Sequence, residues 1–161
     1  MNPRNTRRHW AAWFLVVAAM LLATGARYWF HSTDSPLPKA NVRVNDVPIV
    51  VEIARSATAR EQGLKHRTDL ASGTGMLFVY PEPGILRFWM RDTPVDLDIG
   101  FFDLDGRLIN IRRMQALDDR TFHESDRPAL YALEVPRGWF AEHAISPGAE
   151  LTLPVQHAPT D

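Results

Sequence analysis

The chain has 161 residues, no cysteine, and 18 basic against 19 acidic side chains, for a formal net charge of −1 at neutral pH. All the acidic residues and 14 of the basic ones lie after residue 33, so that part carries a net charge of −5, and nucleic acid is not expected as a partner. The absence of cysteine excludes disulfides, thiol catalysis and cysteine-based zinc sites.

Residues 1–30 have the pattern of a signal peptide or signal anchor. Three arginines precede an uncharged, apolar run over residues 10–26, whose length is at the lower limit for a membrane-spanning helix. Small residues at 23–26 suit cleavage, whereas the aromatic residues 28–30 suit the interfacial collar of an uncleaved anchor. We therefore expect a domain in the periplasm, either anchored in the inner membrane through residues 10–26 or released by cleavage.

Three further segments follow the signal region. Residues 31–41, rich in proline and serine, predict a linker, and residues 42–155 predict a β-rich globular domain. Residues 156–161 have little apolar character and predict a disordered tail. The expected fold class is mainly β, or β-rich α+β: a compact, barrel- or sandwich-like single domain with one or two short helices, preceded by the N-terminal hydrophobic helix.

The first half of the domain predicts a hairpin, a short helix and two strands. The hairpin strands are residues 42–44 and 49–53, with Asn45 and Asp46 in the turn. The sequence Thr58-Ala59-Arg60-Glu61 matches the capping box of a helix start, and Gly63 ends that helix within a turn. Residues 76–80 are continuously apolar and predict a buried strand, and residues 85–90 alternate and predict another.

The second half predicts a hairpin and two more strands. Residues 95–102 and 107–112 flank an Asp-Leu-Asp-Gly turn, with Val95, Leu97, Ile99 and Phe101 on one face of the first strand. Asp96, Asp98 and Gly100 lie on the other face. Residues 129–135 and 150–153 predict strands, and residues 139–143 predict a single helical turn.

Metal and cofactor signatures are missing from the sequence. The six histidines are His9, His31, His66, His123, His143 and His157, and no two of them have the spacing of metal ligands. The glycines at 73 and 75 precede a predicted strand and not a helix, so a phosphate-binding loop is not indicated. We therefore expect no metal and no cofactor.

Two features carry candidate chemistry. Asp96 and Asp98 lie on one strand face, where paired carboxylates would divide acid and base roles, or where each would form an ion pair with Arg87 or Arg91. The stripe of Arg87, Trp89 and Arg91 would stack on a sugar or base and hold an anion. The alternative is that the arginine stems only cover a half-buried Trp89.

Ordered blocks of the sequence resemble the family catalogued as domain of unknown function 192. These blocks are Gln62-Gly63-Leu64, Arg67, Leu70, Gly75–Phe78, Phe88–Met90, Thr93, Leu97–Ile99, Leu133–Pro136, Gly138 and Gly148. The resemblance implies a compact, mainly β domain, often exported in bacteria, and it implies no established activity, cofactor or catalytic residue. The chain departs from the usual pattern at Lys65, at Arg91-Asp92-Thr93 and at Gly100.

The positions of the resemblance overlap the candidate residues. Arg67, Trp89, Thr93, Asp98 and Glu134 are polar or amphipathic groups among apolar strand residues, and buried polar groups need partners. We predict a network in which Arg67 pairs with Asp98 or Glu134 beneath Trp89. A closed network would be structural, whereas a network open to a cleft would bind a ligand.

The first functional prediction is a small binding or accessory module that engages an envelope protein or a small anionic or sugar ligand through the Trp89 region. Its candidate ligand-binding residues are Arg67, Arg87, Trp89, Arg91, Thr93 and Asp98. The alternative is a small hydrolase-like enzyme that uses Asp98, with Asp96 or Glu134, as acid and base.

Overall fold

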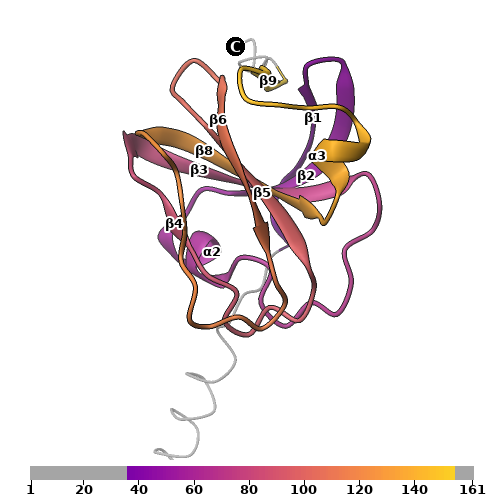
Figure 1. The fold of residues 1–161 in the computed structure, drawn as a ribbon, viewed down its shortest axis with the longest axis vertical. Coiled ribbons are helices and arrows are strands. Elements are labelled where there is room, and N and C mark those ends of the chain that lie inside the picture. Colours follow the sequence, from indigo (N-terminus) through magenta and orange to yellow (C-terminus); the bar gives the residue numbers. More distant parts are fainter. Residues whose placement is uncertain (1–35, 155–161) are drawn as a thin grey trace, which may run out of the picture. The chain divides into compact units, whose positions relative to one another are not determined.

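A seven-stranded sheet in the order β6-β5-β8-β3-β2-β1-β9 is the main element of the computed structural model, which describes residues 36–154 (Figure 1). Its strands are β1 (Lys39–Val44), β2 (Val47–Ala54), β3 (Thr74–Gly84), β5 (Leu97–Phe102), β6 (Leu108–Met114), β8 (Ala129–Pro136) and β9 (Leu151–Thr152). The strands β4 (Arg87–Phe88) and β7 (His123–Glu124) form a separate pair, and the helices of this part are α2 (Ala57–Gln62) and α3 (Trp139–Glu142). The predicted fold class is therefore confirmed: a mainly β domain with two short helices.

The two predicted hairpins are confirmed. In β1–β2 the register pairs Val44 with Val47, and Asn45 adopts a positive φ of 51°, which asparagine tolerates in tight turns. The first strand begins at Lys39, however, so the predicted linker over residues 31–41 extends too far. Polar and apolar residues already alternate from Lys39 onward, and this pattern continues the strand backwards from Val42.

Helix α2 begins two residues before the predicted start. Its N-cap is Ser56 and not Thr58, because the Ser56 hydroxyl accepts a hydrogen bond of 3.1 Å from the Ala59 N–H. The helix ends at Gly63 as predicted, where a φ of 50° turns the chain and the Gly63 N–H donates to the Ala59 carbonyl. This early end directs residues 64 and 65 towards the rest of the domain.

The prediction of a strand over residues 85–90 is largely wrong. Strand β3 continues through Pro81 to Gly84, and only Arg87–Phe88 are in strand conformation, paired with β7 instead of the main sheet. The predicted alternation holds, since Leu86, Phe88 and Met90 are buried. The same period-two pattern suits a short segment that packs on a sheet as well as a strand within it.

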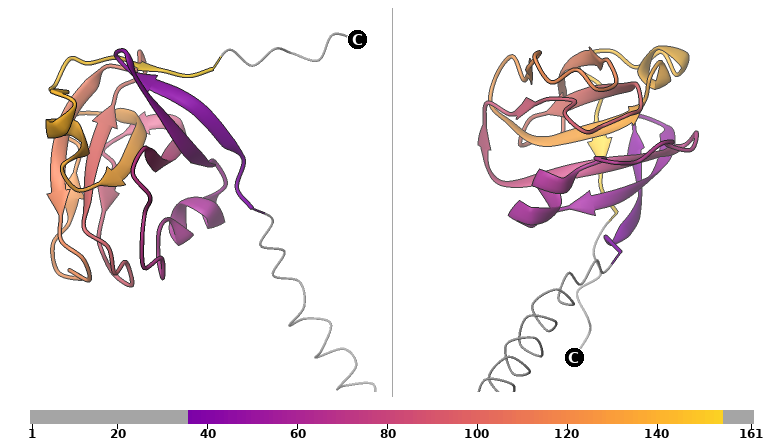
Figure 2. Two further views of the ribbon diagram at one scale, coloured as in Figure 1. Left: turned by 90° about the vertical axis from the view of Figure 1, so that its right-hand side faces the viewer. Right: turned by 90° about the horizontal axis from the view of Figure 1, so that it is seen from below.

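The main sheet is buried on both faces, and each face has its own core. One core contains Val42, Val44, Ile49, Val51, Leu77, Phe102, Leu133, Val135, Trp139 and Phe140. The other contains Leu64, Met76, Phe78, Phe88, Met90, Leu97, Ile99, Phe101 and Ala132. The helices lie on opposite sides of the sheet, α3 against the first core and the α2 region against the second (Figure 2).

The sheet curls until its two outer strands approach each other. An isolated bridge joins Arg107, just before β6, to Glu150, just before β9. Around it the Leu108 N–H donates to the Ala149 carbonyl at 2.7 Å, and the Leu151 N–H donates to the Gly106 carbonyl at 2.8 Å. The architecture is a curled half-barrel whose two edges are joined at one end.

The face of β5 that carries Asp98 and Gly100 is buried, although its sequence predicts a polar face. Helix α3 covers it, and a Cβ added at Gly100 would lie 2.6 Å from Cζ of Phe140. Glycine is therefore required at this position by close packing, not by an unusual φ.

In residues 36–154, no helix has the length and apolar character that a membrane crossing needs. The predicted signal segment at residues 1–30, with its hydrophobic helix, lies outside the described residues, as does the predicted tail at 156–161.

Candidate functional site

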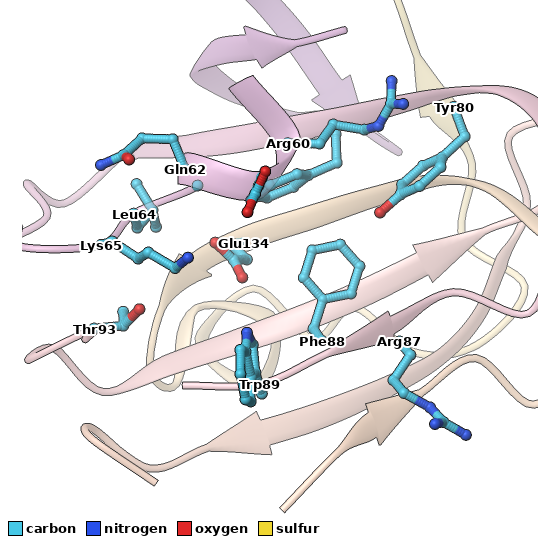
Figure 3. Close-up of a pocket in the computed structure, with 13 residues that line it drawn as sticks. Arg60, Gln62, Leu64, Lys65, Tyr80, Arg87, Phe88, Trp89, Thr93 and Glu134 are labelled. Atoms are coloured by element: carbon cyan, nitrogen blue, oxygen red, sulfur yellow. The ribbon is translucent and has the colours of Figure 1, made fainter. Parts of the chain in front are cut away.

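A cavity of about 280 Å³ lies on the side of the sheet that carries α2 (Figure 3). Residues 60–65, from the end of α2 and the loop after it, form one wall, and residues 87–89 form the opposite wall. Glu134, from the interior strand β8, forms the floor. This volume is just below the usual range for ligand sites, which begins at roughly 300 Å³.

Glu134 is the most unusual residue of this cavity. Its strand lies between β3 and β5, where Met76 and Ile99 are its direct neighbours in register. Only 5% of the residue is exposed, and burial alone raises the pKa of its carboxyl to about 8. Because no hydrogen bond or ion pair within residues 36–154 offsets this burial, the carboxyl holds its proton at neutral pH.

Aromatic rings form the apolar part of the walls. Phe78 and Phe88 meet edge to face with their ring centroids 4.9 Å apart. Tyr80 lies beneath the guanidinium of Arg60, whose Cζ is 4.7 Å from the ring centroid. Burial raises the pKa of Tyr80, the nearby Arg60 lowers it, and the charge of Glu134 raises it further. Tyr80 and Glu134 therefore interact electrostatically once Glu134 loses its proton, above about pH 8.

The polar groups around Glu134 are mostly hydrogen-bond donors. In Figure 3 the ammonium of Lys65 points towards the Glu134 carboxyl, and the indole nitrogen of Trp89 points the same way from the opposite wall. Thr93 is buried and adds a hydroxyl at the same end of the cavity. Among the ion pairs formed within residues 36–154, none uses Lys65. Lysine ammonium and indole N–H can only donate.

The faces of Trp89 are already used within the domain. The Arg91 guanidinium lies 4.4 Å from the centre of the Trp89 ring, and Phe122 stacks on Trp89 with centroids 5.8 Å apart and ring planes 10° apart. Arg87 lies 5.2 Å from the centroid of Phe122 and pairs with Glu124. The predicted stripe is therefore assembled in space, but Trp89 offers its N–H edge to the cavity and not a free face for stacking on a sugar or base.

The predicted network around Arg67 is wrong. Arg67 forms a two-pronged ion pair with Glu52, at 2.5 and 3.0 Å, and contacts neither Asp98 nor Glu134. Hydrogen bonds from Arg67 lower the pKa of Glu52. The pair lines a different, smaller cavity beside β2. Arg67 therefore holds Glu52 of the sheet and does not line the Glu134 cavity. Glu52 was missed because no local pattern distinguishes it from an exposed strand residue.

Asp98 and Glu134 lie on opposite faces of the sheet. In the β5–β8 register Asp98 pairs with Val135, and Ile99 pairs with Glu134; cross-strand partners share a face. Asp98 accepts a hydrogen bond of 2.9 Å from the Gly138 N–H at the start of α3, and its Oδ1 is buried without a partner among the described residues. Burial raises the pKa of Asp98, although the Gly138 N–H and nearby arginines lower it.

The predicted ion pairs of Asp96 and Asp98 with Arg87 or Arg91 are also wrong. Asp96 pairs with Arg137 at 3.0 Å and accepts a hydrogen bond of 2.8 Å from the Ala116 N–H. Asp98 contacts backbone, as described above. The two aspartates therefore support different turns and do not act as a pair.

Replacing Asp98 with alanine is expected to lower the free energy of unfolding by about 2 kcal/mol, because the Gly138 N–H loses its acceptor. Asp98→Asn keeps an acceptor oxygen and should lose much less. Urea unfolding of the two variants measures this difference. Equal losses in both would mean that the hydrogen bond to Gly138 does not hold α3 in place.

In residues 36–154, no three His, Asp or Glu side chains gather to hold a metal ion. His123 is buried with an unpartnered Nε2, and burial lowers its pKa. It packs behind the cavity wall, since it pairs in register with Phe88.

Comparisons with known proteins agree with this fold. The model of the family DUF192, described as Uncharacterized ACR, matches residues 40–153. A protein of unknown function from Novosphingobium aromaticivorans DSM 12444 is 34% identical, with a TM-score of 0.69, over 74% of this chain and 88% of that one. A proposed transcription regulator from Sinorhizobium meliloti 1021 is 30% identical, with a TM-score of 0.69, over 73% of this chain and 95% of that one. No curated protein matches the sequence. The family match covers the sheet, both cores and the Glu134 cavity, and the chain belongs to the DUF192 family.

Proposed function

We propose that the protein is a small binding module of the cell envelope that holds a polar ligand of monosaccharide size in the Glu134 cavity. The observation that carries this proposal is the buried carboxyl of Glu134 at the floor of an open cavity, without a partner in residues 36–154. Burying an unpaired carboxyl costs stability, and such a cost is typical of a group kept for binding or catalysis.

The walls of the cavity fit a small ligand with both apolar and polar surface. Tyr80 and Phe88 offer aromatic carbon, and Lys65 and the edge of Trp89 offer donors near Glu134. The Thr93 hydroxyl donates to the Arg91 carbonyl at 3.3 Å and is left with acceptor capacity. This combination of apolar walls and a few converging polar groups is typical of small-molecule sites.

The location in the envelope rests on the sequence. The basic start of the chain and the apolar run at residues 10–26 favour export, with the domain either anchored in the inner membrane or free in the periplasm.

The catalytic alternative has less support. A hydrolase that used Asp98 with Glu134 would need both carboxyl groups near one substrate bond, and the β5–β8 register places them on opposite faces of the sheet. Asp96 is held by Arg137 away from Glu134. Glu134 alone provides one acid without a second carboxylate beside it.

The proposal is tested by titrating the full chain with D-glucose, D-glucuronate, D-glucosamine and glucose 6-phosphate, with isothermal calorimetry as the measurement. We expect saturable binding of at least one of them, weakened about tenfold or more by Trp89→Ala because the indole N–H is lost. Leu104→Ala, which removes an exposed apolar side chain from the β5–β6 turn, is the control and should bind like the wild type. Failure of all four compounds to bind, or binding that Trp89→Ala leaves unchanged, would overturn the proposal.

A further inference from the structure

We propose that the ligand of the Glu134 cavity is an oxyanion, a carboxylate or a phosphate on a hydroxylated molecule, held by Lys65, the indole N–H of Trp89 and Glu134. This inference rests on the proposed function, since it names the chemical class of the ligand in the same cavity.

The first argument is the charge of the groups that face Glu134. Residues 60–65 contribute Arg60, Glu61 and Lys65, the β4 segment contributes Arg87, and β3 contributes only the neutral Tyr80. With Glu134 neutral and Arg87 paired with Glu124, the cavity keeps two cations, Arg60 and Lys65, against one exposed carboxylate. Its potential is therefore positive and attracts an anion.

The second argument is that only one of these cations is free to bind. The Arg60 guanidinium donates to the carbonyls of Arg55 and Val79 and lies on Tyr80. Arg87 pairs with Glu124. Lys65 takes part in no ion pair within residues 36–154, and its ammonium points towards Glu134 in Figure 3. A ligand anion would supply the negatively charged partner that Lys65 lacks among these residues.

The third argument concerns Glu134 itself. A carboxylate in this position would repel a bound anion, whereas a protonated carboxyl donates a hydrogen bond to it. The indole N–H of Trp89 is directed to the same place, so the groups that converge on the floor are donors. Charged and N–H donors that converge on the floor favour an oxyanion over an ammonium group.

The two kinds of ligand differ in the proton that accompanies binding. Free Glu134, with a pKa of about 8, is roughly one-quarter protonated at pH 8.5. Binding of an anion that requires the protonated carboxyl therefore takes up about three-quarters of a proton per site at that pH. A ligand ammonium would instead favour the ionised carboxylate and release a proton.

The experiment is calorimetry of the full chain at pH 7 and pH 8.5, in two buffers of different ionisation enthalpy, which gives the number of protons exchanged. D-glucuronate and glucose 6-phosphate distinguish carboxylate from phosphate. D-glucose is the neutral control at both pH values, and D-glucosamine, which is mostly an ammonium ion at pH 7, is the cationic control at pH 7. We expect an anion to bind at least tenfold more tightly than D-glucose, with proton uptake at pH 8.5 and an affinity that falls up to tenfold per pH unit above 8.

Three variants complete the test. Lys65→Met should remove most of the preference for the anion over D-glucose, and Lys65→Arg should restore it. Lys39→Met, which removes the same charge at another cavity, is the matched control. Glu134→Gln keeps a donor and should abolish the proton uptake.

The outcomes separate the two proposals. Tighter binding of D-glucose or D-glucosamine, or proton release, would overturn the oxyanion and leave the binding function standing. Anion binding that Lys65→Met and Lys39→Met weaken equally would also overturn it, because the preference would then come from net charge alone. The absence of binding by all four compounds would overturn the binding function itself.

Discussion

Glu134→Gln is expected to raise the free energy of unfolding above that of the wild type by an amount that grows with pH. The folded protein keeps the proton of Glu134 up to a pKa of about 8, whereas an ordinary glutamate loses it near 4.5. Rising pH therefore destabilises the wild type between these values, by about 1.4 kcal/mol per pH unit. Glutamine has no proton to lose, so the two proteins should be similar near pH 4.5 and differ by about 4 kcal/mol near pH 8.

The measurement is urea unfolding of both proteins at several pH values from 4.5 to 8.5. The difference between them isolates Glu134, because every other group titrates in both. Glu61→Gln, on the exposed rim of the same cavity, is the matched control and should leave the pH dependence of the wild type in place. A difference that stays constant with pH would mean that Glu134 ionises as an ordinary surface carboxyl does.

Gly75→Ala is expected to lower the free energy of unfolding by about 3 kcal/mol, at the upper end of the usual cost of overpacking. A Cβ at this position would lie 2.6 Å from the Glu134 carbonyl oxygen and 3.2 Å from Cγ1 of Val135. The first contact is with backbone in the middle of the sheet, so it cannot be relieved by a side-chain rotation. The variant should also weaken the binding of any ligand to the Glu134 cavity, because β8 must move to relieve the contact.

Gly84→Ala is the control for this substitution. It lies at the end of the same strand, and no atom lies within 4 Å of its added Cβ. It should change stability by less than about 0.5 kcal/mol, as exposed substitutions usually do. Thermal or urea unfolding of both variants decides the matter: equal losses would place the cost in the backbone preference of glycine and not in the close approach of β3 and β8.

The local elements of the fold follow from the sequence. The turns at Asn45 and Gly106 join strands that are adjacent in the chain, so their hairpins depend only on local turn chemistry and alternation. The early end of α2 follows from Gly63 in the same way. The parallel pairing of β2 with β3, and the position of β8 between β3 and β5, depend on contacts between distant segments that no local pattern encodes.

In the candidate site, too, some residues follow from local sequence patterns and others depend on contacts between distant segments. Trp89, Thr93 and Glu134 were identified as polar or amphipathic groups on apolar segments, and all three line the cavity. In the sequence Lys65 is only a departure from the family pattern, because its place in the cavity depends on how the loop after α2 returns to the sheet. The sequence predicts Asp98 near Glu134, but the two residues lie on opposite faces of the sheet. Alternation shows which residues of one strand share a face, but the register with the neighbouring strand cannot be read from it.

The joined edges of the curled sheet bear on how copies of this domain behave when they are crowded. Strand β9 has only two residues, and the outer strand β6 contains Arg112 and Arg113. The first residues of β6 are covered by the segment 149–151. Short outer strands and edge arginines are the features that discourage one sheet from extending into another. Many copies held at one surface would thus meet without offering each other a long, flat strand to pair with, so crowding alone would not drive them to aggregate.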